Sequence, residues 1–187
     1  MVLTNVETAL LQLTGEKKLV SGYELNALIE ERGYRNWAGI GKTSIYNTLL
    51  KLKKKKFIQE KEYSKKSGKG PAPKKHSLTL EGFNALKTET LQALQGSVRG
   101  GNAFELALAS IPAAGFKKSA AALRVRAGNL EKSVSGLKKT FEKQGGERLP
   151  VFVRALFERP IIMIEADLKY TRFLAAELEK GFKNGKN

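Results

Sequence analysis

The stretch from Ser44 to Gly82 restricts the fold of this 187-residue chain more than any other part of the sequence. It begins with a short amphipathic segment in which Ile45, Leu49 and Leu52 recur at helical spacing. A lysine-rich stretch interrupted by Gly and Pro follows, and the pattern then opens another helix. A helix with one polar face, followed by a basic hairpin, is typical of winged helices, in which the helix enters the major groove of DNA and the hairpin lies along phosphates. The stretch therefore predicts a DNA-binding domain.

The charge of the chain favours the same class of partner. The formal net charge is +16 and the isoelectric point is about 10.0, which favours nucleic acid first and an anionic membrane surface second. Eleven lysines lie between Lys51 and Lys75, where the only acids are Glu60 and Glu62. Such clustering indicates a binding surface, because the same charges scattered would only promote solubility.

The sequence predicts a protein of the reducing cytoplasm with no membrane partner. It contains no cysteine, which excludes disulfides and thiolate metal sites. The N-terminus lacks the basic region of a signal peptide, and Glu7 interrupts its short apolar stretch. The most apolar segment, residues 151–164, contains charges and Pro160 and is too short to span a bilayer.

Capping patterns predict two helices before the basic stretch. Thr4 and Glu7 have the spacing of a capping box, and we expect a helix from Thr4 to Leu13 that residues 15–18 break. Ser21 and Glu24 repeat the spacing and open a second helix. A third helix begins near residues 42–43.

The third helix and the hairpin supply the candidate DNA contacts. The side of this helix opposite Ile45 and Leu49 is polar and would face the base edges, while the N–H groups at its start could hold a phosphate. Strands are expected at 57–63 and around His76, joined by a basic tip, with a helix capped by Thr79 running to about Gln95. The candidate contacts on the helix are Lys42, Thr43, Ser44, Tyr46, Asn47, Thr48 and Lys51, and those on the hairpin are Lys65, Lys66, Lys69, Lys74 and Lys75.

The second half of the chain predicts an antiparallel pair of long helices. We place a winged domain at residues 1–95, a linker at 96–102 and a helical domain at 103–187. Apolar residues recur at alternating spacings of four and three on both sides of a Gly145-Gly146 turn, and Pro160 is expected to kink or restart the second helix. The stripes could simply form the domain's core, but a two-helix hairpin leaves one face open, which a second copy would close. The candidate dimer contacts are Leu123, Leu130, Val134, Leu137, Ile164, Leu168 and Leu178. The predicted fold is mainly α, with a small β-hairpin wing.

The sequence offers little enzyme chemistry, and we predict neither catalysis, a cofactor nor a metal. His76 is the only histidine and Asp167 the only aspartate, and Asp167 is expected to be solvated. Gly39–Thr43 resembles the end of a phosphate-binding loop, but Asn36 occupies the position of the first required glycine. A small hydrophobic effector is a further candidate partner, with Trp37, Phe152, Phe157 and Tyr170 as candidate lining or ordinary core residues.

Three segments resemble the PadR family of bacterial transcriptional regulators. They are Ser21–Leu25, the Tyr46-x-x-Leu49-x-x-Leu52 pattern and Leu78–Gly82, and the resemblance covers most of residues 3–88. The second half is similar only in layout to longer, AphA-like members. The resemblance implies a winged helix-turn-helix, a homodimer and, usually, repression of nearby promoters. Some members respond to phenolic compounds or hydrophobic drugs.

The chain departs from the family pattern at positions near the expected DNA-binding surface. Asn47 replaces the usual proline after the helix tyrosine, Lys56 replaces a glycine at the turn into the wing, and Lys75 with His76 replaces wing aromatics. The alternative function is a non-specific architectural nucleic-acid-binding protein that relies on charge alone.

Overall fold

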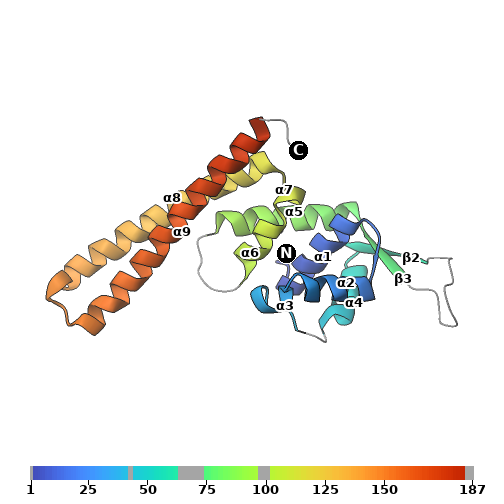
Figure 1. Ribbon diagram of the computed structural model, residues 1–187, viewed down its shortest axis with the longest axis horizontal. Coiled ribbons are helices and arrows are strands. Elements are labelled where there is room, and N and C mark those ends of the chain that lie inside the picture. Colours follow the sequence, from blue (N-terminus) through green and yellow to red (C-terminus); the bar gives the residue numbers. More distant parts are fainter. Residues whose placement is uncertain (1, 42–43, 63–73, 97–101, 184–187) are drawn as a thin grey trace. The chain divides into compact units, whose positions relative to one another are not determined.

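The structure is a computed structural model that describes residues 2–41, 44–62, 74–96 and 102–183. Figure 1 shows the course of the chain, coloured from blue at the N-terminus to red at the C-terminus. The elements in chain order are α1 (Asn5–Lys17), β1 (Val20–Ser21), α2 (Gly22–Glu31), α3 (Tyr34–Trp37), α4 (Ser44–Lys54), β2 (Ile58–Glu62), β3 (Lys74–Leu78), α5 (Leu80–Gln95), α6 (Ala103–Ala109), α7 (Ile111–Ala114), α8 (Phe116–Gln144), η1 (Gly146–Arg148) and α9 (Val151–Lys183). The fold is a winged helix followed by a helical hairpin, as the sequence predicted.

The chain divides into two compact units. The first comprises residues 1–93 and 100–115, and the second comprises 94–99 and 116–187. Helices α6 and α7 therefore pack with the winged unit, although the predicted boundary placed everything after residue 102 in the helical domain. These two helices are short, and their Leu106 joins the core formed by the N-terminal helices.

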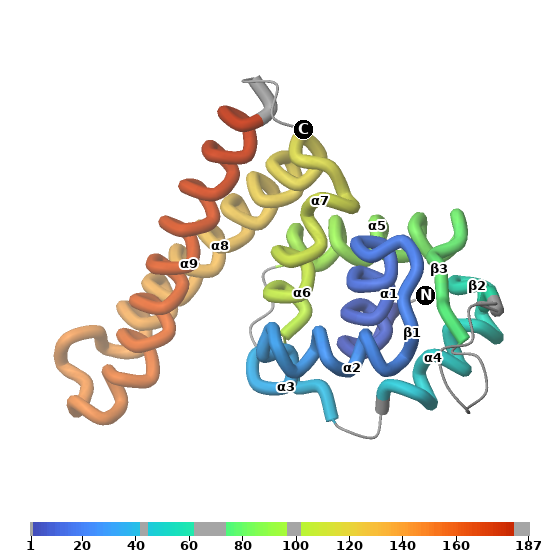
Figure 2. Tube along the Cα trace, turned by 45° about the vertical axis from the view of Figure 1, so that its right-hand side comes forward, coloured from blue at the N-terminus to red at the C-terminus, as the bar shows by residue number. Residues whose placement is uncertain are grey.

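Helix α1 is the centre of the winged unit. It packs against α2, α4, α6 and β3, and Figure 2 shows these elements around it. The predicted capping box is confirmed, because Thr4 N donates to Glu7 Oε2 at 3.0 Å and Glu7 N donates to Thr4 Oγ1 at 3.3 Å. The helix continues past Leu13, its predicted last residue, to Lys17 and stops at Lys18, whose φ of 62° leaves the helical region.

The sheet has three strands in the order β1-β3-β2, all antiparallel neighbours. The β2–β3 hairpin is the predicted wing, with Ile58 opposite Leu78 and Glu60 opposite His76. The two-residue strand β1 was not predicted, since Val20 gains its strand geometry only by pairing with His76. This pairing fastens the base of the wing to the start of α2.

A close backbone contact joins the turn before β2 to the start of α5. Lys56 has a φ of 59°, a left-handed conformation that glycine adopts more readily than lysine. Thr79 Oγ1 accepts from Gly82 N at 3.0 Å, which confirms the predicted cap. A Cβ at Gly82 would stand 2.0 Å from the carbonyl oxygen of Phe57. Only glycine therefore fits here without a backbone shift.

The second unit is built on the antiparallel pair α8 and α9, joined by η1. Leu130, Val134 and Ile164 form a buried cluster between them, with Leu137, Ile161 and Leu168 packed against it. The predicted stripes therefore meet within a single chain: Leu123 is also buried and Leu178 is half-buried. Pro160 lies inside one continuous α9, so the helix does not restart there, which was one of the two predicted alternatives.

A buried ion pair crosses the hairpin. Arg126 Nη2 of α8 lies 2.7 Å from Asp167 Oδ2 of α9, and the Arg126 side chain is 5% exposed. Asp167 also accepts from the Thr171 hydroxyl at 3.2 Å. The expectation that Asp167 is solvated was wrong, because its carboxylate is half-buried and paired with Arg126, a residue distant in sequence.

Candidate nucleic-acid interface

Helix α4 presents two clearly different faces. Ile45, Leu49 and Leu52 are buried against α1 and α2, as their spacing predicted. Because an α-helix turns about 100° per residue, the opposite arc holds positions 46, 47, 50, 51 and 54. All five of these side chains are exposed: Tyr46, Asn47, Leu50, Lys51 and Lys54.

Most described candidate contacts of α4 lie on this exposed arc, but Thr48 does not. Its exposed fraction is only 8%, since it lies about 60° from Ile45 on the core side of the helix. Leu50, which the sequence reasoning missed, is 61% exposed in its place. The same helical arithmetic applied to each residue would have found it. The side chain of Ser44 and all of Lys42 and Thr43 fall outside the described residues.

A glycine sets how closely α2 approaches α4. A Cβ at Gly22 would stand 2.9 Å from the Tyr46 ring and 3.2 Å from the Leu49 side chain. The start of α2 is fixed by a capping box, in which Ser21 N donates to Glu24 Oε2 at 2.6 Å and Glu24 N donates to Ser21 Oγ at 3.2 Å. The two helices therefore form a tight helix-turn-helix, with the exposed arc of α4 held in a fixed orientation.

The wing carries an ion cluster centred on one acid. Glu60 of β2 contacts Lys53 of α4, and its Oε1 lies 2.9 Å from Lys74 Nζ. Hydrogen bonds from Lys53 and Lys74 lower the pKa of Glu60 to about 2. The cluster ties the end of α4 to the wing and keeps Glu60 charged over the physiological range.

The candidate lysines of the wing fall into two groups. Lys74 and Lys75 lie in β3 rather than at the tip, and the Lys75 ammonium is 3.5 Å from Glu24. Lys65, Lys66 and Lys69 lie outside the described residues. Among the residues that the structure does describe, several lysines around the interface have no acidic partner: Lys51, Lys54, Lys56 and Lys61. Their charge is available to a polyanion.

His76, the only histidine in the sequence, lies in the central strand of the sheet, opposite Val20 and Glu60. It is half-buried in β3, and burial lowers its pKa. In the part of the chain that the structure describes, no group of three or more His, Cys, Asp or Glu side chains could hold a metal ion. Within the same residues, each helix is too short or too polar to cross a bilayer.

Three of the four aromatic residues considered for an effector site, Trp37, Phe157 and Tyr170, have ring partners within their own units. Trp37 lies 4.3 Å from Tyr34 between ring centroids and donates Nε1–H to the Arg32 carbonyl at 2.9 Å. Phe157 packs on Phe141 with centroids 5.6 Å apart. These contacts are those of ordinary core and surface packing.

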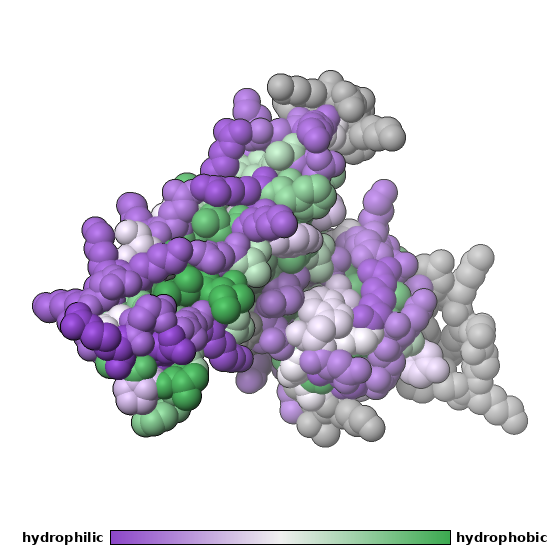
Figure 3. Space-filling view, turned by 60° about the vertical axis from the view of Figure 1, so that its left-hand side comes forward, coloured by the Kyte–Doolittle hydropathy of each residue, from purple (hydrophilic) through white to green (hydrophobic). Residues whose placement is uncertain are grey.

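Helix α9 has a second apolar face that the hairpin does not cover. Phe152, Leu156, Met163 and Tyr170 are exposed, and their spacings of four, seven and seven place them within about 40° of one another around the helix. Ile164 and Leu168 lie on the buried side. Figure 3 shows hydrophobic side chains interrupting the hydrophilic surface of the hairpin.

Comparisons with known proteins find structural likeness but no sequence family. No protein-family model matches the chain, and no curated protein matches it. PadR of Bacillus subtilis in complex with operator DNA is 19% identical, with a TM-score of 0.43, and the match covers 92% of this chain and 98% of that chain. The same protein in complex with p-coumaric acid is 18% identical, with a TM-score of 0.39 and coverage of 94% and 99%. The structure of smu.1604c from Streptococcus mutans UA159 is 19% identical, with a TM-score of 0.40 and coverage of 94% and 99%.

Proposed function

We propose that this protein is a sequence-specific DNA-binding transcriptional regulator that acts as a homodimer and represses transcription. The observation that carries the proposal is the exposed arc of α4, which combines the amide of Asn47 with uncommitted lysines and two apolar side chains. A helix face of this composition matches the major groove, where base edges and phosphates alternate. The resemblance of residues 3–88 to PadR regulators favours repression.

The arc also favours a particular kind of base pair. Asn47 can pair through two hydrogen bonds with the N6 and N7 of adenine. Leu50 lies three residues further along the same face, and an apolar side chain in the major groove packs on the thymine methyl. Tyr46 supplies a second apolar surface. We expect the half-site to contain A·T pairs where the middle of α4 meets the groove.

The uncovered face of α9 supports the proposed dimerisation. The candidates Leu123, Leu130, Val134 and Ile164 are already covered by the hairpin, so the exposed stripe is the better contact with a second copy. Leu137, Leu168 and Leu178, which are only half-buried, could border that contact. A two-fold dimer would place two α4 helices in successive major grooves about 34–36 Å apart.

Two substitutions on the arc distinguish base-specific contacts from contacts with the phosphate backbone. Selection from a random duplex pool first defines the preferred site. Asn47→Ala is then expected to relax preference at one base pair, by about 1–3 kcal/mol. Lys54→Ala is expected to weaken all duplexes alike and to flatten the salt dependence by about one unit. If both variants lost affinity equally for selected and random DNA, the proposed division of roles would be wrong.

The net charge of +16 favours one other function, a non-specific architectural nucleic-acid-binding protein. Selected and random duplexes of equal length would then bind equally at every salt concentration. A regulator is expected to prefer its selected duplex by about 1,000-fold or more at physiological salt. The ratio of the two affinities therefore decides between the proposals.

A further inference from the structure

We infer that the outer face of α8 is a second DNA-binding surface, in addition to the arc of α4. The face carries four exposed lysines, which we call the lysine row: Lys118, Lys132, Lys139 and Lys143. At about 100° per residue, the four lie within about 60° of one another around the helix. Lys132 lies about 160° from both Leu130 and Val134, which pack on α9. The row therefore points away from the partner helix.

The excess positive charge of α8 is concentrated on this outer face. The helix contains eight basic residues and two acids. On its flank, Arg124 lies 2.6 Å from Glu179 of α9, and Lys138 lies 2.7 Å from Glu165. None of the four lysines of the row forms an ion pair with an acid in the part of the chain that the structure describes. Their charge is therefore free to meet an external polyanion.

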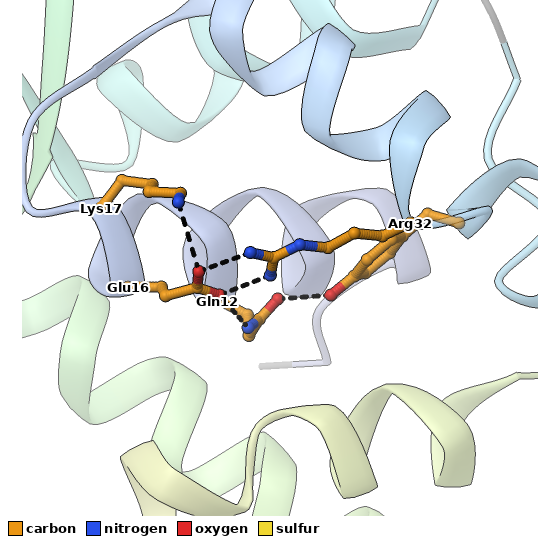
Figure 4. Close-up of polar contacts among 5 residues, drawn as sticks. Gln12, Glu16, Lys17 and Arg32 are labelled. Carbon is orange, nitrogen blue, oxygen red and sulfur yellow. Dashed lines mark hydrogen bonds and ion pairs between the residues drawn. The ribbon is translucent and has the colours of Figure 1, made fainter.

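The row differs from the paired cations of the winged unit. There the Arg32 guanidinium donates to both carboxylate oxygens of Glu16 at 2.6 and 2.7 Å, with the Lys17 ammonium 3.7 Å from the same acid, as Figure 4 shows. In the row, Lys139 and Lys143 are four residues apart on one face, where like charges destabilise a helix. A bound polyanion would relieve this repulsion.

The spacing of the row suits an extended polyanion better than a small anion. From Lys118 to Lys143 the helix rises about 37 Å, close to one turn of duplex DNA, which is about 34–36 Å. Lys132 and Lys139 are about 10 Å apart along the helix axis, too far to converge on one phosphate. A duplex presents one negative charge about every 1.7 Å of its axis, so each lysine can reach a phosphate of its own.

Two glycines keep the surface beside the lysines low. Gly128 and Gly136 lie on the same outer arc, and a Cβ at either position would meet nothing within 4 Å. A glycine inside a helix destabilises it, and here no packing within the chain requires one. Glycine also permits the close approach of another backbone. A sugar-phosphate strand can therefore lie close to α8 at these positions.

The composition of the face favours DNA over a membrane or a protein. Within α8, all of which the structure describes, Val125 is the one large apolar side chain that is exposed. A helix that binds a membrane surface buries an apolar face in the lipid, and a protein interface is usually centred on large apolar or aromatic anchors. Lysines alone contact phosphates regardless of base sequence. Because the row is on α8, dimerisation through the exposed face of α9 need not cover it.

Binding of a random-sequence duplex of about 40 base pairs to the full-length protein tests the row. Lys132→Gln with Lys139→Gln is expected to weaken binding at low salt at least about tenfold, and to flatten the salt dependence by about two units for each row engaged. Arg124→Gln with Lys138→Gln is the matched control, since it removes the same charge from the same helix at side chains already paired with acids. We expect it to leave the salt dependence nearly unchanged. Equal losses in the two double variants, or wild-type binding by the first, would overturn the proposed surface.

Val125→Lys tests the same surface by a gain of affinity. Val125 is seven residues from both Lys118 and Lys132, so the substitution fills the gap in the row. We expect the random duplex to bind about threefold more tightly or better, with a salt dependence about one unit steeper. Thermal unfolding verifies that each variant is folded. Unchanged affinity and salt dependence would contradict contact between this face and DNA.

Vesicles of phosphatidylcholine and phosphatidylserine are the second probe. Vesicle binding that requires Lys132 and Lys139, together with duplex binding that does not, would overturn DNA as the partner of the row. Absence of vesicle binding together with the expected loss of duplex binding would support it. Because the duplex is random, the outcome does not depend on the sequence preference of α4. Loss of that preference in Asn47→Ala tests the proposed regulator separately.

Discussion

The winged unit and the helical hairpin bury their apolar side chains to very different extents. In the winged unit one continuous core joins residues of all four N-terminal helices with β1, β2, α5 and α6. Its exposed α4 arc is mostly polar and cationic, with Tyr46 and Leu50 as its apolar residues. In the hairpin, the cluster around Leu130 and Ile164 occupies only the surface between the two helices.

The difference indicates what each unit needs to be complete. Two helices can cover only one stripe of each other, so a helix with two apolar faces leaves one in water. The α9 face formed by Phe152, Leu156, Met163 and Tyr170 is such a face. We therefore expect the cationic arc of α4 to suit a polyanion and the apolar face of α9 to suit another protein surface.

The largest expected effect follows from breaking the hairpin's exposed stripe. The double substitution Leu156→Lys with Met163→Lys puts charges into the proposed dimer interface, where desolvating them is costly. We expect wild type to sediment as a dimer and the variant to associate more than about 100-fold less tightly. Circular dichroism should show unchanged helix content. Val125→Lys, at an exposed α8 position, serves as the control, and a variant that stays dimeric would exclude this stripe.

Two glycine-to-alanine substitutions compare how tightly the backbone is packed at one position in each unit. Gly82→Ala must displace the Phe57 carbonyl of the winged unit, and we expect it to lose about 2–3 kcal/mol of unfolding free energy. Gly136→Ala in α8 meets nothing within 4 Å, so it should gain about 0.5–1 kcal/mol from helix propensity. Chemical denaturation measures both. Similar values for the two variants would contradict the close packing at Gly82.

A smaller effect is expected at the link between α1 and α4. Glu7, whose side chain is 5% exposed, binds the Lys55 ammonium just after the end of α4. Burial raises the pKa of Glu7, but hydrogen bonds from Lys55 and the Thr4 backbone outweigh it, and the pKa is lowered overall. Glu7→Gln keeps the capping box and removes the ion pair, at a cost of about 1.5 kcal/mol. Combination with Lys55→Gln in a double-mutant cycle measures the coupling, which would be absent if the contact contributed nothing.

The smallest expected effect is a pH dependence at the wing. The pKa of Glu60 is about 2 in the folded protein, below the unfolded value of about 4.3, so folding is favoured when Glu60 is charged. Its contribution is present above about pH 4–5 and is lost as the pH falls toward 2. Because Lys53 and Lys74 are half or more exposed, the contribution should stay below about 1 kcal/mol. Glu60→Gln should therefore lower the melting temperature at pH 7 and not at pH 2, whereas an equal loss at both would contradict the ion pair.

Features that depend on neighbouring residues were predictable from the sequence alone. The capping boxes at Thr4 and Ser21, the Thr79 cap and the buried ridge of Ile45 and Leu49 all follow from spacings of three or four residues. Local hydrogen bonds and helical periodicity decide such features, and both are written in the order of residues. The winged helix and the helical hairpin follow from the same local signals.

Features that depend on distant partners were decided only by the tertiary structure. Strand β1 exists because Val20 meets His76, and the Asp167 carboxylate is paired because Arg126 lies across the hairpin. Which stripe of α9 faces α8 and which faces water was likewise a matter of packing, since both stripes are apolar. The periodicity of the sequence determined which side chains share a face of each helix. Contacts between residues far apart in the chain determined which neighbour each face packs against.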